Sequence, residues 1–135
     1  MTRINIIDPA TLTDQHLMAE YRELPMVHAA LRRSLKSKHG LQGIPPKFTL
    51  NTGHVKFFYD KGEYLHKRYG LLIEELQKRG FKLDPNRAVD WTVFKDNDLY
   101  NDWSPTAEDQ VIILQRIHQK IAMKRSWYRY YGKPI

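Results

Sequence analysis

Three stretches of the sequence repeat apolar residues every three or four positions, and this spacing constrains the fold more than any other feature. The first begins near residues 11–14 and continues to about 38, the second runs from 53 to 79, and the third runs from 104 to 121. Apolar side chains at this spacing share one face of an α-helix. The sequence therefore predicts an all-α fold over residues 1–135, a compact single domain of three main helices with long loops.

Residues typical of helix ends bound these stretches. Ser104 and Pro105 suit an N-cap and a first helical position, and Gly80 suits the left-handed position just beyond a helix. Pro25 lies inside the first stretch and removes one helix hydrogen bond, so we expect a kink near residues 21–25. Gly62 and Gly70 are expected to permit close helix packing. Residues 39–52 and 81–103 show no sustained period and are predicted to be irregular.

The chain is basic, and its positive charge is concentrated after Asp109. There are 22 Lys and Arg residues against 15 Asp and Glu residues, a formal net charge of +7. Asp109 is the last acidic residue, and the positions beyond it carry six cations: Arg116, Lys120, Lys124, Arg125, Arg129 and Lys133. Cations clustered in this way favour a polyanionic partner, because each phosphate contact releases counterions.

The aromatic residues of the C-terminal tail, residues 127–135, are interleaved with cations. Arg116, Lys120 and Lys124 are spaced to form one basic ridge on the third helix, and the tail adds four rings: Trp127, Tyr128, Tyr130 and Tyr131. Aromatic rings can stack on distorted or unpaired bases, so this segment favours contact with nucleic acid. The alternative is a solvated helix face followed by a tail that is anchored on the core.

Several chemistries have no support in the sequence. The chain lacks cysteine, which excludes a disulfide scaffold, a thiolate zinc site and a cysteine nucleophile. Its six histidines include no pair three or four residues apart, and the sequence contains no nucleotide-binding or serine-hydrolase motif. The longest aliphatic run, Val111 to Leu114, is too short to cross a bilayer, so we expect a soluble cytoplasmic protein without a membrane partner.

Thr2 offers a nucleophile that needs no thiol or metal. A residue this small after the initiator Met normally allows the Met to be removed, which would leave Thr2 with a free α-amine. The pKa of an α-amine is about 7.7–8.0, against about 10.4 for lysine, so roughly a tenth of it is unprotonated at neutral pH. Such an amine can attack an electrophilic sugar carbon and form a Schiff base.

Four blocks of sequence carry a family resemblance. They are Met1–Asn5, Asp14–Pro25, Gly53–Lys61 and Trp127–Lys133. In order and spacing they resemble the phage-type endonuclease V family, the pyrimidine-dimer DNA glycosylases and apurinic/apyrimidinic (AP) lyases. The resemblance implies a DNA repair enzyme that excises ultraviolet-induced cyclobutane pyrimidine dimers and then cuts the strand by β-elimination.

The resemblance also implies roles for individual residues. The α-amine of Thr2 attacks the sugar, and Glu23 serves as the carboxylate that moves protons and stabilises the cationic intermediate. Glu20, one helical turn away, is assigned to structure. Together with the basic and aromatic segment above, the expected DNA-binding residues are Arg3, Gln15, His16, Arg22, Lys120, Lys124, Trp127, Tyr128, Arg129 and Lys133.

The resemblance implies no metal and no cofactor, and a monomer that binds double-stranded DNA containing pyrimidine dimers or abasic sites. It also implies that a base opposite the lesion is extruded. Met26 departs from the family pattern, which has an arginine there, so phosphate contact is expected to depend more on Arg22, Arg32 and Arg33. Two alternatives stay open: a non-catalytic DNA-binding protein, and a glycosylase for other base damage.

Overall fold

The computed structural model describes residues 2–38, 40–41, 43–84 and 88–135, and within them the fold is helical, as predicted. The three main helices are α1 (Asp14–Lys36), α3 (Gly62–Lys78) and α5 (Ala107–Met123). Short elements connect them: the 3₁₀ turns η1 (Pro9–Thr11) and η2 (Arg125–Trp127), and the single-turn helices α2 (His54–Phe57) and α4 (Thr92–Lys95). A small antiparallel hairpin of β1 (Arg129–Tyr130) and β2 (Lys133–Pro134) follows η2.

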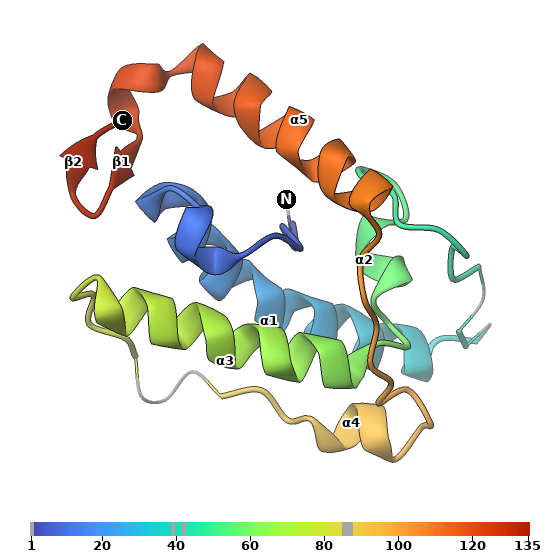
Figure 1. The fold of residues 1–135 in the computed structure, drawn as a ribbon. Helices are drawn as coiled ribbons and strands as arrows, with labels where there is room; N and C mark the ends of the chain where they lie inside the picture. The colour runs from blue at the N-terminus through green and yellow to red at the C-terminus, as the bar shows by residue number, and fades with distance from the viewer. Residues whose placement is uncertain (1, 39, 42, 85–87) are drawn as a thin grey trace.

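Helices α1 and α3 lie side by side and form the base of the core (Figure 1). Their facing sides supply fully buried leucines, among them Leu17, Leu24, Leu65 and Leu72. The side chain of Thr13 caps the start of α1 by accepting the backbone N–H of His16. From there α1 runs without interruption through Pro25.

The predicted helix over residues 53–79 is wrong in its first third, because the chain turns between α2 and α3. The backbone N–H of Gly62 donates to the carbonyl of Leu99 at 2.9 Å instead of continuing a helix from α2. Gly62 also packs directly on the ring of Phe94, where a Cβ would lie 2.5 Å from Phe94 Cβ and Cγ. Close packing at Gly62 is therefore confirmed. At Gly70 that prediction is wrong, because a Cβ added there would have no neighbouring atom within 4 Å.

The end of α3 lies where the sequence predicts it, whereas the start of α5 does not. Gly80 follows α3 with a φ of +88°, and the next residue, Phe81, donates its N–H back to the carbonyl of Leu76, as expected for a left-handed helix stop. The start predicted at Ser104 and Pro105 is wrong by two residues. Thr106 is the N-cap of α5, and it exchanges two hydrogen bonds with Asp109 in a capping box.

The N-terminal segment, residues 2–7, has no regular secondary structure and lies between α1 and α5 (Figure 1). Ile4 and Ile6 are buried in the core, and α5 covers the segment with Ile113 and Ile117. The carbonyl of Ile6 accepts the side-chain N–H of Gln110 on α5 at 3.4 Å. The segment is therefore enclosed by the helices.

Sequence reasoning missed the short helix α4 and the β1–β2 hairpin. The hairpin docks on the start of α1, where the carboxylate of Asp14 accepts the backbone N–H groups of Tyr131 and Gly132 at 3.1 and 2.8 Å. Among the described helices, none combines the length and apolar character that crossing a membrane requires.

Candidate active site and nucleic-acid interface

The N-terminal segment brings Thr2 to the exposed side of α1. Buried polar groups hold its backbone: the N–H of Asn5 donates to Glu20 Oε1 at 3.2 Å, and a guanidinium N–H of Arg68 donates to the carbonyl of Ile7. Thr2 Oγ1 lies 3.4 Å from Met26 Sδ. Met26 is three residues beyond Glu23, so the two occupy neighbouring positions on one face of α1. Thr2 therefore contacts α1 at a residue about one helical turn beyond Glu23.

The two acidic residues of α1 have different surroundings. Glu20 has a side chain with 0% exposure, and Arg68 pairs with both its oxygens through Nε at 2.7 Å and Nη2 at 2.9 Å. This is the structural role predicted for Glu20. Glu23 Oε2 is buried but has no hydrogen-bond partner among the described residues. Burial raises the pKa of Glu23, and the positive charge of Arg3 opposes that shift.

Glu23 lies in a cavity of about 220 Å³, here called the Glu23 cavity. Three parts of the chain meet in it, and its lining comprises Arg3, Asn5, His16, Ala19, Glu20, Glu23 and Lys120. The fold thus brings the predicted residues Arg3, His16 and Lys120 to the predicted carboxylate. Burial lowers the pKa of Arg3, and the nearby charge of Arg116 lowers it further. Of the basic ridge of α5, Lys120 therefore lines this cavity, and Arg116 acts on its residue Arg3.

Two further cavities flank α1. The first, of about 830 Å³, is here called the Thr2 cavity; its lining includes Thr2, the α1 residues Met26 and Arg33, and Lys56 and Tyr59 of the segment that follows α1. The second, of about 400 Å³, is here called the tail cavity; its lining includes Gln15, Arg22, Phe81, Trp127 and Arg129. Apolar surface between cations suits an unstacked base beside phosphates.

The comparison with protein-family models decides the identity. The model described as pyrimidine dimer DNA glycosylase matches residues 1–89 of the 135. The chain belongs to this family. It is therefore a DNA glycosylase of the class that acts on pyrimidine dimers in DNA repair, and the resemblance found in the sequence is confirmed.

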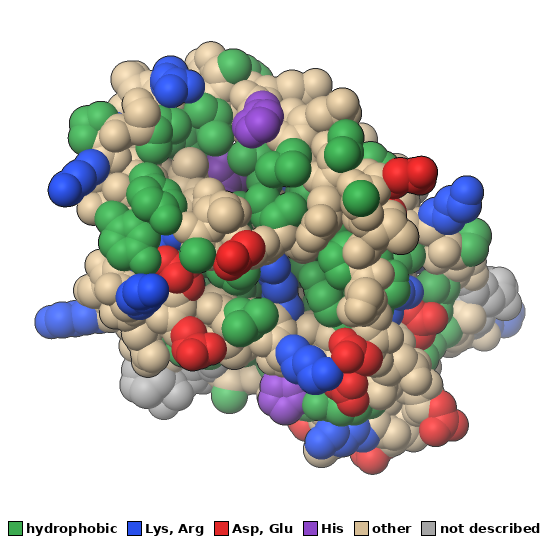
Figure 2. Space-filling model, viewed as in Figure 1, with side chains coloured by type: hydrophobic (Ala, Val, Ile, Leu, Met, Phe, Trp, Pro, Cys, Tyr) green, Lys and Arg blue, Asp and Glu red, His purple; other side chains and the backbone are tan. Residues whose placement is uncertain are grey.

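In this pyrimidine dimer DNA glycosylase the matched region contains Thr2 and Glu23. It also contains residues that line each of the three cavities. Helix α5 and the tail lie beyond the match. Lys124 and Lys133 are exposed and line none of the three cavities. Figure 2 shows Lys and Arg side chains scattered over the face in view, at its edge and near its centre.

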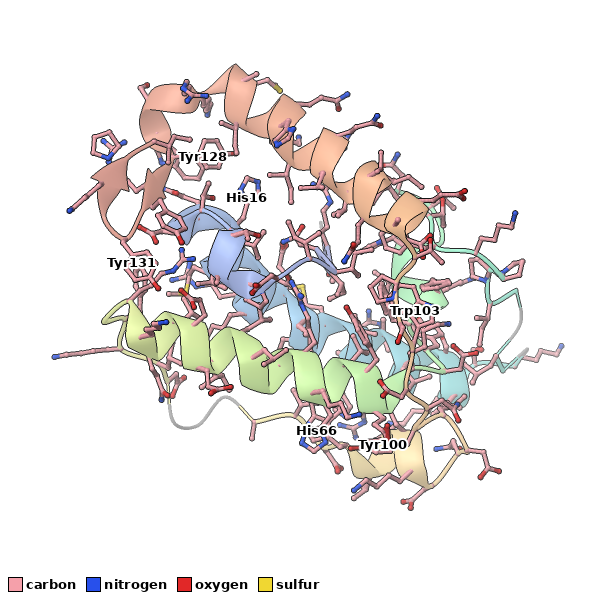
Figure 3. The ribbon with its side chains drawn as sticks, viewed as in Figure 1. His16, His66, Tyr100, Trp103, Tyr128 and Tyr131 are labelled. Atoms are coloured by element: carbon pink, nitrogen blue, oxygen red, sulfur yellow. The ribbon has the colours of Figure 1, made fainter. Side chains whose placement is uncertain are left out.

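Three of the residues expected to bind DNA make contacts that hold the tail of the glycosylase. Gln15 donates to the carbonyl of Trp127 at 2.7 Å and accepts the N–H of Arg129 at 2.9 Å. The ring of His16 stacks on Tyr128 at 5.0 Å between centroids, and the two point toward one another in Figure 3. Burial lowers the pKa of His16 to about 4, so its ring is neutral at pH 7.

Sequence reasoning missed the polar residues that support this site. His54, Arg68 and Arg79 form no spaced motif, because their partners lie on other elements. His54 falls inside the block Gly53–Lys61 on which the resemblance rests, which was the available signal. Arg68 and Arg79 are cations inside the predicted helix over residues 53–79, and their position there was the available signal.

Proposed function

We propose that this pyrimidine dimer DNA glycosylase excises the dimer through an imine on the α-amine of Thr2 and then cleaves the strand as an AP lyase. The observation that carries the proposal is the buried Glu23 Oε2, which has no hydrogen-bond partner among the described residues and shares one cavity with Arg3 and Lys120. Thr2 contacts α1 at Met26, about one helical turn beyond Glu23. A carboxylate with one oxygen that lacks a hydrogen-bond donor among the described residues, and whose pKa is raised by burial, is suited to accept a proton during the reaction.

The reaction begins when the amine nitrogen of Thr2 attacks C1′ of the damaged nucleotide. The bond from C1′ to the pyrimidine nitrogen breaks, and its electron pair leaves with the base. Loss of the amine proton and opening of the sugar ring, with O4′ taking up a proton, give a protonated imine between Thr2 and C1′. The negative charge of Glu23 stabilises the cation that develops at this step.

Strand cleavage follows from the same imine. Glu23 takes a proton from C2′, the electron pair forms a C2′–C3′ double bond, and the 3′ phosphate leaves as the C3′–O bond breaks. Water then hydrolyses the imine and restores the amine. Arg3 and Lys120 are the cations of the Glu23 cavity, and we assign them to the phosphates that flank the damaged sugar.

The protein acts as a monomer on double-stranded DNA that contains dimers or abasic sites. Around the damaged nucleotide, the tail cavity and its surroundings supply the remaining DNA contacts: Arg22, Lys124, Trp127, Arg129 and Lys133. Gln15, His16 and Tyr128 serve the same interface by holding the tail against α1. The apolar lining of the tail cavity supports its use by an extruded base.

The test incubates the protein with duplexes that carry one cyclobutane dimer, one abasic site or one oxidised base, in the presence of borohydride. Mass spectrometry then identifies the residue that carries the reduced adduct. We expect an adduct on Thr2 with the first two duplexes. Adducts on a lysine overturn the mechanism, adducts with only the oxidised base favour the other-damage glycosylase, and binding without any adduct favours the non-catalytic protein.

Glu23→Gln supplies the second arm, with Glu74→Gln as its matched control. Glu74 is exposed on α3 and lines none of the three cavities described above. We expect Glu23→Gln to lower the rate of strand cleavage by about a hundredfold or more, within the range for loss of an acid–base group. Equal rates for the two variants would remove Glu23 from the chemistry.

A further inference from the structure

His54 lies at the start of α2 and contacts the N-terminal segment directly. Its side chain is buried, with 2% of the residue exposed. His54 Nε2 lies 2.9 Å from the backbone nitrogen of Ile4, and Nδ1 lies 2.9 Å from the carbonyl oxygen of Thr49. The ring therefore connects the loop before α2 to a position two residues from Thr2.

These two partners fix the protonation of the ring. The backbone N–H of Ile4 can only donate, so Nε2 must be the unprotonated acceptor. The carbonyl of Thr49 can only accept, so Nδ1 must carry the proton. His54 is thus held as one neutral tautomer, and a second proton on Nε2 would remove the hydrogen bond to Ile4.

Aromatic rings and a glycine keep His54 in place. Phe48 and Phe58 each meet the imidazole edge to face, at 5.4 Å between centroids. Gly53, the residue before it, has a φ of +92°, and a Cβ there would lie 3.1 Å from Pro45 Cγ. The ring consequently has a fixed orientation toward Ile4.

The charged groups that face the ring are Arg3 and Glu20. Burial lowers the pKa of His54 most; the hydrogen bond to Thr49 and the charge of Glu20 raise it, and the charge of Arg3 lowers it. The neutral ring needed for the hydrogen bond to Ile4 is therefore the form favoured at neutral pH.

We infer that His54 is a positioning residue, which holds the backbone at Ile4 and thereby sets where the reactive amine of Thr2 lies. The inference rests on the imine mechanism proposed above. Among the described backbone hydrogen bonds of residues 2–7, the one from Ile4 to His54 is nearest to Thr2 in sequence. Misplacing a reacting group by about 1 Å can slow a reaction on the order of a hundredfold.

The test compares three variants by single-turnover borohydride trapping on a duplex with one dimer, alongside the Kd for that duplex. His54→Phe keeps an aromatic ring beside Phe48 and Phe58 and removes both hydrogen bonds. His54→Gln offers one acceptor and one donor as a partial replacement. Phe94→Leu disturbs a fully buried ring beside Gly62 and is the control for lost stability alone.

We expect His54→Phe to slow trapping by about ten- to a hundredfold while the Kd changes by less than about threefold. His54→Gln should recover part of the rate. Phe94→Leu should lower the Tm and leave the trapping rate within about twofold of the wild type at a temperature where each variant is folded. This pattern would support a positioning role, because lost stability alone does not change the rate of the folded protein.

An unchanged rate in His54→Phe overturns the inference, and so does a loss that appears only in the Kd or that Phe94→Leu reproduces. These outcomes leave the imine mechanism standing as long as the wild type gives the adduct on Thr2. A wild type that gives no adduct on Thr2 overturns the mechanism itself, and the inference with it.

Discussion

Arg79 Nη1, at the C-cap of α3, lies 2.9 Å from Asp14 Oδ1 at the start of α1, and the Arg79 side chain has 0% exposure. The same guanidinium pairs with Glu75 through Nε at 2.8 Å, and Glu75 accepts the hydroxyl of Tyr131 at 2.6 Å. Asp14 in turn holds the backbone of Tyr131 and Gly132. The buried Arg79 side chain thus orients the two carboxylates that hold the tail.

Replacing Arg79 with Met should therefore release the tail. Removing one partner of a buried ion pair leaves unpaired charge, and the expected loss of unfolding free energy is about 3–5 kcal/mol. Urea denaturation measures that loss, and limited trypsin digestion should cut the variant faster near Arg125 and Arg129. Lys67→Met removes an exposed pair with Asp102 and should change neither measurement appreciably. Equal digestion of the two variants would contradict the anchoring role.

Gly62 and Gly70 should respond to alanine in opposite directions. A Cβ at Gly62 would lie 2.5 Å from atoms of Phe94, so Gly62→Ala should lower the unfolding free energy by about 1–3 kcal/mol through overpacking. Gly70 is exposed inside α3 with no atom within 4 Å, so Gly70→Ala should raise it by about 0.5–1 kcal/mol. Thermal unfolding of both variants checks the signs, and a stabilising Gly62→Ala would be incompatible with the observed contact.

His16 should make the protein less stable as the pH falls. Its pKa is about 4 in the fold against 6.5 in the unfolded chain, so between these values the unfolded chain binds more protons. The unfolding free energy therefore falls as the pH drops from about 6.5 toward about 4. Urea titrations across this range should show a smaller fall in His16→Phe, which retains a ring to stack on Tyr128. Parallel curves for variant and wild type would refute this assignment.

The α5 cations should determine part of the salt dependence of DNA binding. Lys120 lines the Glu23 cavity and Lys124 is exposed at the end of α5. Each phosphate contact contributes roughly one to the slope of log affinity against log salt concentration, so Lys120→Ala with Lys124→Ala should flatten that slope by about two. Fluorescence anisotropy at several salt concentrations measures it, with Lys95→Ala on α4 as the control. An unchanged slope would place α5 outside the interface.

Met26→Arg should strengthen binding to undamaged DNA. Met26 is 53% exposed on the lining of the Thr2 cavity, so a longer cationic side chain can be accommodated at this position. One added phosphate contact should steepen the salt slope by about one. The same anisotropy titration measures the change. An affinity and slope equal to those of the wild type would mean that DNA does not pass Met26.

The sequence was most informative where structure depends on near neighbours. The periods of α1, α3 and α5 and the glycine stop at Gly80 follow from residues within a few positions of one another. The capping box of Thr106 and Asp109 was equally local and could have corrected the start of α5. The turn before α3 could not be predicted, because it depends on the contact of Gly62 with Phe94 and Leu99.

The residues of the candidate site also divide into those with a local sequence signal and those whose partners are distant in sequence. Thr2 and Glu23 followed from a resemblance carried by contiguous blocks of sequence. His54 meets Ile4 across 50 positions and Gln15 meets Arg129 across 114, and no spacing rule reports such pairs. The β1–β2 hairpin has only two residues in each strand, and its backbone is held by Asp14, so strand propensity alone would not reveal it.

Helix α1 holds both the N-terminal segment, through Glu20, and the tail, through Asp14 and Gln15. On the ribosome these parts emerge in the order segment, α1, tail, with more than a hundred positions between the first and the last. Synthesis thus separates the amine that we propose as the nucleophile in time from the tail that we propose to contact DNA. A nascent chain can present that amine early, but the proposed interface is complete only when the tail reaches α1.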